Sequence, residues 1–289
     1  MTAHLHSMLS RLQKMRLMAK TRRRGAHKGG RTANKFGTSL EFSDFRIYQP
    51  GDDVRQIDWN IYGRTQKHYI KRFLDEQELA VTIFLDASSS MQAIDSKWNR
   101  AKELAAAFSY IALTGEDRLS FIPVSSASYA KVSRKGSVYS KHVFFEILQL
   151  PKQEAAGTFT DSFQKNTLKH NQLVILITDG LEPLESFEEL FRLLAAAKQE
   201  VKLIQLLSRE ELEPIYSGDL KLIDSESNES VNVTMNESIL VKYQKQVQEH
   251  NFMLEALCRR FGFSYLLTTD DADLKNFLFL ECSAKRMLY

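Results

Sequence analysis

Hydrophobic residues along this chain follow two spacings, short apolar runs and longer segments with an apolar residue every three or four positions. From residue 79 onward the two kinds of segment alternate. The apolar runs cover 79–85, 118–124, 173–178, 201–207 and 263–267, and the segments with helical spacing cover 97–113, 141–150, 186–199, 239–261 and 271–280. Apolar strands separated by helices predict an α/β fold with a mostly parallel sheet that helices cover on both faces.

Residues 215–238 interrupt this alternation. Two strand-like runs, 220–223 and 231–235, flank a polar stretch, and this pattern predicts an inserted hairpin. We expect the hairpin to pack on residues 36–78 and form a small β subdomain with them. The long helix that follows is expected to stop at Gly262, which can serve as its C-cap.

Residues 36–78 are rich in charged and aromatic side chains and predict short strands and loops. Pro50 and Gly51 suit the two central positions of a type II turn, and 69–73 predicts a strand. The acids here invite an interpretation as catalytic acid and base, but nearby arginines favour a charge-paired scaffold. The acids are Glu41, Asp44, Asp52, Asp53 and Asp58, and the arginines are Arg46, Arg55 and Arg64. Trp59 and Tyr48 are interpreted as packing groups.

The first 35 residues form a basic arm with ten Lys or Arg and no acid, so the remaining chain carries −7 of the net charge of +3. Apolar residues lie on one stripe of a helix at its start: Leu5, Met8, Leu9, Leu12 and Met15. A basic loop is expected at 21–30. The stripe could pack on the domain, or the arm could bind nucleic acid, an anionic membrane or an acidic partner.

The expected organisation has four parts. A basic helix and loop (1–35) precede a strand and loop segment (36–78), an α/β domain (79–281) that carries the hairpin, and a tail (282–289).

Composition narrows the class of protein. The chain has 289 residues, of which 43% are hydrophobic and 26% are charged, which excludes a mostly disordered protein. The apolar runs are too short for a membrane-spanning helix, and no apolar core follows the basic start as in a secretory signal. Cys258 and Cys282 form neither a disulfide framework nor a metal-binding spacing, which suits a reducing compartment. We therefore expect a cytoplasmic protein.

Candidate chemistry is concentrated where the first apolar run ends. Asp86 follows that strand, and the hydroxyls of Ser88 and Ser90 come two and four residues later. Ligands of open α/β sheets bind at the carboxyl ends of the strands. Three hard oxygen ligands on one loop suit Mg²⁺, Mn²⁺ or Ca²⁺.

Two later segments offer companion ligands for the same cation. Gly157-Thr158-Phe159-Thr160 precedes an expected helix, and Thr178-Asp179-Gly180 ends the strand at 173–178. Thr160 competes with Thr158 for the role of second-loop ligand. The alternative for Asp86, Ser88 and Ser90 is a helix-capping or turn role, and for Asp179 it is a turn role before Gly180. For Asp161 we prefer helix capping to metal binding.

This combination resembles a von Willebrand factor A domain with a metal-ion-dependent adhesion site. Asp86, Ser88 and Ser90 match its D-x-S-x-S element, and Thr158 and Asp179 match its second-loop and third-loop ligands. The segment 41–59, with Gly63-Arg64-Thr65 and 75–79, resembles the signature of the bacterial domain-of-unknown-function family number 58. The resemblance implies a Rossmann-like domain without catalytic activity, and an adaptor or chaperone-like role beside a MoxR-type AAA+ ATPase.

Two classes of function remain open from the residues alone. In the first, a cation held mainly by hydroxyls keeps excess positive charge and accepts an acidic side chain of a partner protein, with no small-molecule substrate or organic cofactor. In the second, Asp86 is the nucleophile of a Mg²⁺-dependent phosphoryl-transfer enzyme. That chemistry favours a second Asp at position 88, where this chain has Ser, so we favour the non-enzymatic function. The phosphate-binding motif G-x-x-x-x-G-K-[ST] is absent from the sequence, so ATP hydrolysis would have to come from a partner.

Overall fold

The computed structural model describes residues 2–19, 28–127, 129–153, 157–164, 172–215, 218–223 and 230–289. The chain divides into two compact units. Unit 1 contains residues 1–22 and 80–289, and unit 2 contains residues 23–79. We expected a boundary after residue 35, but this position lies in the middle of strand β1 (Lys28–Ile47). Most of the expected basic loop at 21–30 lies outside the described residues.

Unit 1 is built on a six-stranded sheet with the order β10-β7-β6-β3-β4-β5. The strands are β3 (Ala80–Asp86), β4 (Arg118–Val124), β5 (Val132–Lys135), β6 (Leu173–Thr178), β7 (Glu200–Leu207) and β10 (Ser264–Thr269). All neighbours run parallel except β4 and β5. The α/β class expected from the sequence is therefore confirmed. The sequence pattern missed β5, a short edge strand in which only Val132 is buried.

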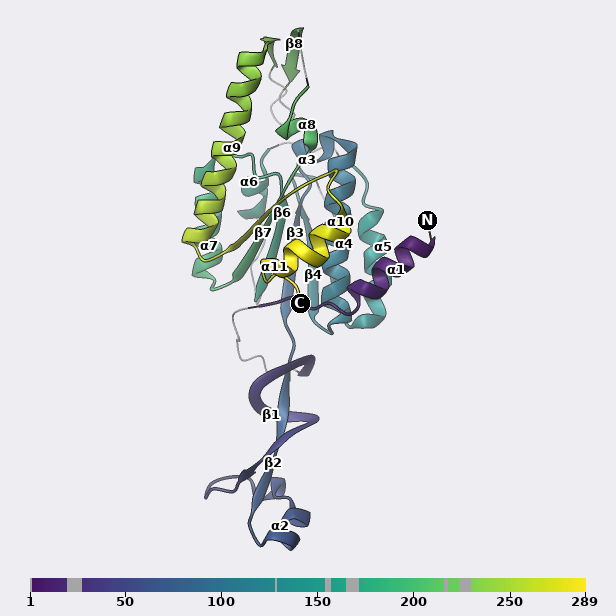
Figure 1. The fold of residues 1–289 in the computed structure, drawn as a ribbon, viewed down its shortest axis with the longest axis vertical. Helices are drawn as coiled ribbons and strands as arrows, with labels where there is room; N and C mark the ends of the chain where they lie inside the picture. Colours follow the sequence, from purple (N-terminus) through teal and green to yellow (C-terminus); the bar gives the residue numbers. More distant parts are fainter. Residues whose placement is uncertain are drawn as a thin grey trace. The chain divides into compact units, whose positions relative to one another are not determined.

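Helices cover the sheet on both sides, as Figure 1 shows. The helix α4 (Asp95–Thr114) contacts β3, β4, β6 and β7, and α5 (Ser140–Leu148) packs on α4. The other group comprises α6 (Phe159–Gln164), α7 (Leu184–Ala196) and α9 (Glu237–Arg260), which contact β4, β7 and β10 respectively. The predicted helices are thus present, with ends that differ by a few residues.

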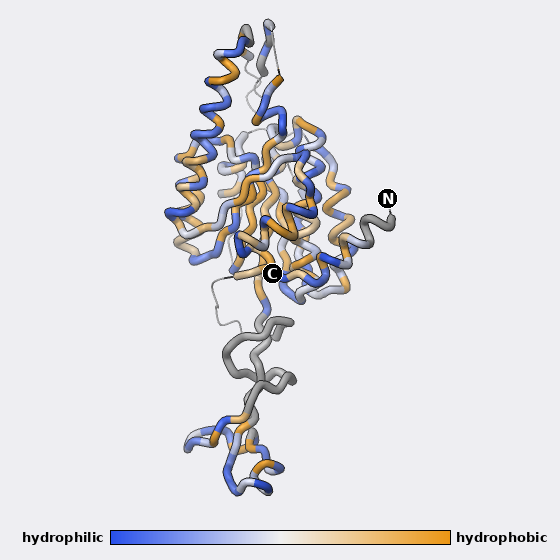
Figure 2. The backbone as a smooth tube through the Cα atoms, viewed as in Figure 1, coloured by the Kyte–Doolittle hydropathy of each residue, from blue (hydrophilic) through white to orange (hydrophobic). Residues whose placement is uncertain are grey.

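The core lies where the apolar strands meet these helices, and the strands form the orange centre of Figure 2. The β6 segment is buried at every position, which explains its unbroken apolar sequence. One cluster joins the sheet to α6, α7 and α9, and its largest members are Phe84, Phe159, Phe163, Phe187 and Phe191.

Beyond β7, the chain forms α8 (Arg209–Leu212) and then the predicted hairpin, β8 (Gly218–Ile223) with β9 (Ser230–Met235). The polar stretch between these strands lies largely outside the described residues. Among the described residues, β8 and β9 pair with each other and belong to unit 1, whereas residues 36–78 belong to unit 2, so the hairpin shares no sheet with them and its packing on that segment stays a prediction. The helix α9 ends just before Gly262, whose φ of +73° is typical of the residue after a helix.

The two sequence ends of unit 1 are joined by backbone pairing. The amides of Arg16 and Met18 donate to the carbonyls of Tyr289 and Met287, and Tyr289 donates back to Arg16. The expected tail is therefore packed: it follows α10 (Leu274–Asn276) and a π-helical turn (Phe277–Glu281), and it starts with α11 (Cys282–Ala284). The Cys282, Met287 and Leu288 side chains are fully or almost fully buried.

The first helix, α1 (Thr2–Leu12), buries its apolar stripe against unit 1. Met8, Leu9 and Leu12 are buried, and Met15 is half-buried just beyond the helix; the Leu5 side chain lies outside the described ones. The guanidinium of Arg11 lies 4.0 Å from the ring centroid of Phe279. This geometry supports the packing interpretation of the arm, and its binding to nucleic acid or a membrane stays a prediction. Across the described residues, helices with the length and apolar character to cross a bilayer are absent.

Unit 2 contains an antiparallel pair, β1 with β2 (Tyr69–Gln77), and a short helix α2 (Trp59–Thr65) that the sequence pattern missed. The predicted turn is confirmed: Asp52 N donates to Gln49 O at 3.0 Å, and Gly51 has a φ of +102°. Asp52 pairs with Arg46, and Asp53 pairs with Arg55, as the scaffold interpretation predicts. Trp59 was expected to be a packing group, but its side chain is 62% exposed.

Candidate functional site

Strands β3 and β6 lie side by side and parallel, yet the chain leaves β3 for β4 on one side before it returns to β6 on the other. This reversal of direction is a topological switch point, where the loops after two neighbouring strands diverge and leave room for a ligand. Asp86 is the last residue of β3, and Asp179 directly follows β6. Two carboxylates therefore lie at the carboxyl end of the sheet.

Asp86 is held through both of its carboxylate oxygens, one by the loop that follows it and the other by the end of β6. Ser88 N donates to Oδ1 at 2.9 Å, and the Thr178 hydroxyl donates to Oδ2 at 2.6 Å. Ser88 occupies the N-cap position of α3 (Ser89–Ala93), but its hydroxyl makes no capping bond. Instead its Oγ lies 3.0 Å from Ser90 Oγ. The two predicted hydroxyls are therefore adjacent and the Ser88 hydroxyl does not cap α3, while the ligand role of both residues stays a prediction.

The third loop joins Asp179 to a buried lysine. Lys97 Nζ donates to Asp179 Oδ2 at 2.9 Å and to Glu211 Oε1 at 2.7 Å. The Lys97 side chain is completely buried. Glu211 is fixed in turn by a capping box with Ser208 at the start of α8. One ammonium thus lies between two carboxylates, so it compensates only part of their charge.

The second loop is held by Glu182. Its carboxylate accepts from the backbone N–H groups of Phe159 and Thr160 and from the Thr160 hydroxyl. Thr160 is 2% exposed, and its Oγ1 lies 3.4 Å from that of the half-buried Thr158. Thr158 Oγ1 also accepts from Asp161 N, so Thr158 rather than the expected Asp161 caps α6.

Burial and like charge raise pKa values in this region. Burial, followed by the charge of Asp179, raises the pKa of Asp86 to about 8, against the opposing effect of hydrogen bonds from Thr178 and Ser88. Burial also raises the pKa of Glu182, with a smaller contribution from Asp179. Burial alone would lower the pKa of Lys97, but Asp179 and Glu211 outweigh it and the pKa is raised.

A buried amide network fixes the backbone beneath Asp179. Gln205 Nε2 donates to the Asp179 carbonyl and to Asn251 Oδ1, both at 2.8 Å, and the Tyr265 hydroxyl donates to Gln205 Oε1 at 2.6 Å. Gly180 has a φ of +65°, and a Cβ there would approach Leu254 Cδ2 to 2.8 Å, so a side chain has no room. Strand β7 and helix α9 therefore set the position of the third loop.

Hydrogen bonds and charge interactions link only some of the predicted site residues directly. Asp86, Ser88 and Ser90 form one hydrogen-bonded group, and Asp86 interacts electrostatically with Asp179. Thr158 reaches them indirectly, through Thr160 and Glu182. The sequence reasoning missed Lys97, Glu182 and Glu211. A lysine on the apolar face of the predicted helix at 97–113 was the available signal for Lys97.

The donor set fits a hard divalent cation. Asp86 and Asp179 are 1% and 3% exposed, and the single Lys97 ammonium is shared between Asp179 and Glu211. The two carboxylates that share Lys97 keep one uncompensated negative charge, which favours a cation, and carboxylate and hydroxyl oxygens are the ligands of Mg²⁺ and Ca²⁺. Three or more His, Cys, Asp or Glu side chains do not gather at any one place in the described residues, so a site here depends on the hydroxyls.

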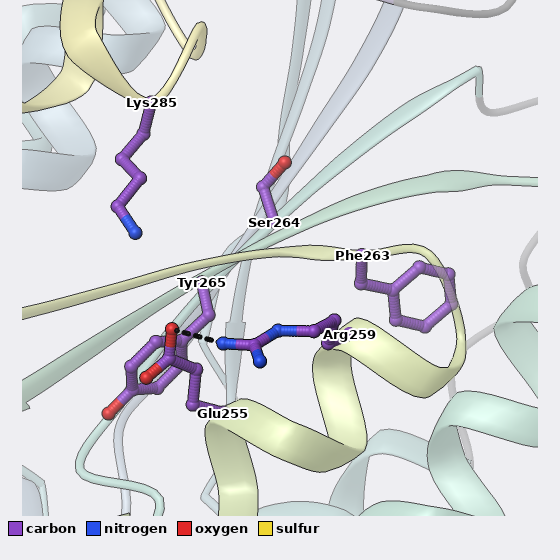
Figure 3. Close-up of a pocket in the computed structure, with 6 residues that line it drawn as sticks. All are labelled: Glu255, Arg259, Phe263, Ser264, Tyr265 and Lys285. Carbon is purple, nitrogen blue, oxygen red and sulfur yellow. Dashed lines mark hydrogen bonds and ion pairs between the residues drawn. The ribbon is translucent and has the colours of Figure 1, made fainter. Parts of the chain in front are cut away.

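A separate open pocket of about 200 Å³ lies near the amino end of β10, away from these loops (Figure 3). Its lining residues are Glu255, Arg259, Phe263, Ser264, Tyr265 and Lys285. Arg259 and Glu255 pair with each other at 3.2 Å within it. The predicted site residues therefore lie outside this pocket.

Several known proteins resemble this chain. A family model described as "Protein of unknown function DUF58" matches residues 44–253. The uncharacterised protein Rv1480 of Mycobacterium tuberculosis is 24% identical over 245 residues, which cover 82% of this chain and 77% of that protein. The conserved hypothetical protein BatB from Bacteroides thetaiotaomicron aligns with 15% identity and a TM-score of 0.37, over 72% of this chain and 98% of that one. The VWA domain of SpRpn10 aligns with 11% identity and a TM-score of 0.38, and the alignment covers 68% of this chain and 92% of that domain.

Proposed function

This chain belongs to the family described as protein of unknown function DUF58, and from that premise we propose that it is a non-enzymatic, divalent-cation-dependent protein-binding module. The proposal rests on one observation. Two buried carboxylates that interact with each other, Asp86 and Asp179, lie at a switch point of the sheet, and the adjacent hydroxyls of Ser88 and Ser90 lie on the segment that follows Asp86. Asp86, Ser88, Ser90, Thr158 and Asp179 would hold the ion, with Mg²⁺ as the expected species and Mn²⁺ or Ca²⁺ as alternatives.

Local charge favours cation binding at this place. Among the described residues, Lys97 is the one cation paired with Asp179 and Glu211, and these two carboxylates bring more negative charge than its single ammonium neutralises. A bound cation supplies positive charge that an acidic side chain can ligate. The neutral hydroxyls of Ser88 and Ser90 leave much of that charge uncompensated, which favours a partner's carboxylate as an additional ligand.

Binding is favoured over phosphoryl transfer by the residues around Asp86. The position two residues later, where the phosphatase pattern favours a second Asp, holds Ser88. Ser88 has no ionisable group for proton transfer in the range where a general acid or base works.

Within this proposal the partner is a MoxR-type AAA+ ATPase, and the chain acts as its adaptor or chaperone-like companion in the cytoplasm. The support is the family resemblance together with the lack of a phosphate-binding loop in the sequence. Co-purification of the two proteins with Mg²⁺ and with EDTA tests this part. The adaptor role predicts a complex that EDTA dissociates.

Direct metal binding is the first experiment. Isothermal titration of the full chain with MgCl₂ and MnCl₂ is expected to give one site for the wild type and none for Asp86→Ala. Asp161→Ala is the matched control, because Asp161 is an exposed acid in the first turn of the neighbouring helix α6. Equal affinity of wild type and Asp86→Ala for both ions would contradict the proposal. A phosphatase screen with Mg²⁺ covers the enzymatic alternative, and turnover lost in Asp86→Asn would favour it.

A further inference from the structure

Four aromatic rings gather beside the exposed face of α2 in unit 2, and we call them the aromatic cluster (Tyr48, Trp59, Tyr62 and His68). Tyr62 and His68 are stacked, with ring centroids 4.5 Å apart and an interplanar angle of 25°. Trp59 lies edge-on to both, at 5.9 Å from Tyr62 and 6.3 Å from His68. Tyr48 adds a tilted contact with His68 at 6.2 Å. Trp59 is 62% exposed, although burial of its ring would favour folding.

The backbone holds these rings in place. Asp58 caps α2, accepting from Asn60 N at 2.9 Å and from Ile61 N at 3.2 Å. This cap fixes Trp59 at the first helical position, and Tyr62 lies one turn later on the same face. Tyr48 N donates to the carbonyl of His68 at 2.9 Å, which holds together the two rings that flank the β1–β2 pair. The cluster is therefore a preformed surface, which lowers the entropic cost of binding.

Charges around the cluster are unequally compensated. All three acids in residues 45–70 have partners: Asp52 pairs with Arg46 at 2.7 Å, Asp53 pairs with Arg55 at 2.8 Å, and Asp58 caps the helix. Arg64 and Lys67, near the carboxyl end of α2, are exposed and form no ion pair with any residue that the structure describes. Arg64 follows Tyr62 by two residues and Lys67 directly precedes His68, so two exposed positive charges without an ion-pair partner lie close in sequence to the rings.

We propose that the aromatic cluster, together with Arg64 and Lys67, is a docking surface for an acidic segment of a partner protein that carries an aromatic or aliphatic side chain. Tryptophan, tyrosine and arginine are the residue types that dominate the energetics of protein interfaces. The uncompensated charges select a negatively charged partner and speed its approach. This surface belongs to unit 2, whereas the candidate cation site belongs to unit 1, so the inference is independent of the cation site.

The ring geometry favours a protein partner over single-stranded nucleic acid. Binding of a strand requires successive rings with free faces along a basic groove. Here Tyr62 and His68 cover one face of each other, and Trp59 meets both at angles of 82° and 87°. Two unpaired cations would neutralise only about two phosphates, too few for tight binding at physiological salt.

The test is a selection of displayed random peptides on the full-length protein, followed by affinity measurement of the enriched peptides as synthetic, fluorescein-labelled probes. We expect enriched sequences to be acidic and to contain an aromatic or aliphatic residue. Trp59→Ala is expected to weaken their binding at least about tenfold. Phe252→Ala is the matched control, because Phe252 is an aromatic side chain with 70% exposure in unit 1, and it is expected to leave the affinity unchanged.

The charge requirement is tested separately. The double variant Arg64→Glu with Lys67→Glu is expected to weaken binding at least about fivefold, and to remove most of the salt dependence seen in the wild type. Lys141→Glu with Lys242→Glu makes the same change in charge at exposed positions of unit 1 and serves as the control.

Fluorescence reports whether the probe reaches the cluster. The chain has two tryptophans, and Trp98 is 1% exposed, so iodide quenching acts mainly on Trp59. A bound peptide is expected to protect Trp59 from iodide. The proposal is overturned if enriched peptides lack acidic character, if they bind Trp59→Ala as tightly as the wild type, or if a labelled oligothymidylate binds through Trp59 while acidic peptides do not.

Discussion

Lys97 and Asp179 form an ion pair from which water is almost completely excluded, with side-chain exposures of 0% and 4%. The pair joins the start of α4 to the loop after β6, and the same ammonium reaches Glu211 in α8. Three elements that are distant in sequence therefore depend on one charge. Removing one partner of a buried ion pair leaves the other charge buried without compensation, so substitutions in this pair are expected to destabilise the protein strongly.

Replacing Lys97 with methionine is expected to destabilise the protein by about 3–5 kcal/mol, because Asp179 stays buried without a cation and Glu211 loses its partner. Urea unfolding in EDTA measures this loss in the free energy of unfolding. Lys245→Met is the control, since the Lys245 pair with Glu249 is exposed on both sides and is worth at most about 1 kcal/mol. If both substitutions lowered the free energy of unfolding by the same amount, the buried pair would contribute no more to stability than the exposed one.

Glu182→Ala is expected to cost about 1–3 kcal/mol of stability and to weaken Mg²⁺ binding about tenfold. The stability loss follows because two backbone donors and the Thr160 hydroxyl lose their acceptor, and the affinity loss follows because the Thr158 loop is no longer tied to the Asp179 loop. Urea unfolding and calorimetric Mg²⁺ titration measure the two effects. Glu185→Ala, an exposed acid three residues away, should change neither. Unchanged Mg²⁺ affinity in Glu182→Ala would limit this residue to a structural role.

Leu12→Ala tests whether α1 is a packed part of unit 1. Leu12 is completely buried, so the truncation is expected to cost about 2–5 kcal/mol in thermal or urea unfolding. Leu280→Ala removes the same atoms at a position that is 64% exposed, and its effect should stay within about 0.5 kcal/mol. A similarly small effect at Leu12 would mean that the helix detaches from the domain in solution and leaves its apolar stripe free for a membrane.

The two thiols are expected to be unreactive in the folded protein. Burial raises the pKa of Cys258 and of Cys282 to about 12, so the thiolate that attacks disulfide reagents is scarce at pH 8. Ellman's reagent should label neither thiol in the native protein within minutes and both in urea. Because both folded-state pKa values lie above the ordinary value of 9.0, the thiols favour the folded state below pH 9, and this stability is lost as the pH rises towards 12. Rapid labelling of the native protein at pH 8 would contradict the packing of both residues.

The sequence predicted β4 and β6 with their observed ends, because each is a run of apolar residues with polar or turn-forming residues on both sides. It missed β5, where a single buried residue leaves no periodic signal, and α2, where Gly63 and a half-exposed surface hide the helical spacing. The cap at Asp58 was the visible signal for α2. The hydrophobic pattern therefore predicted the buried strands and helices. It failed for exposed elements, whose side chains are not required to be apolar at regular spacing.

In the candidate site, the residues that are close in sequence could be predicted, and the contacts between residues distant in sequence could not. Asp86, Ser88 and Ser90 follow one another on a single loop, so their spacing alone predicted a cluster. Lys97 meets partners that are 82 and 114 residues away, and Glu182 crosses from the third loop to the second. Such contacts depend on the strand order, which periodicity does not encode. The interactions that hold the loops together were therefore visible only in three dimensions.

The backbone ladder between residues 16–18 and 287–289 has a consequence for biosynthesis. Its two halves flank all of unit 2 and nearly all of unit 1 in the chain, so the ribosome produces the earlier half long before its pairing partner. During that interval the apolar side chains of α1 lack part of the surface that will cover them. Contacts of such large sequence separation form late and slowly. Closure of this ladder is thus expected to be a late step in the folding of unit 1, and until then the exposed apolar face of the nascent helix is a natural client for a holdase.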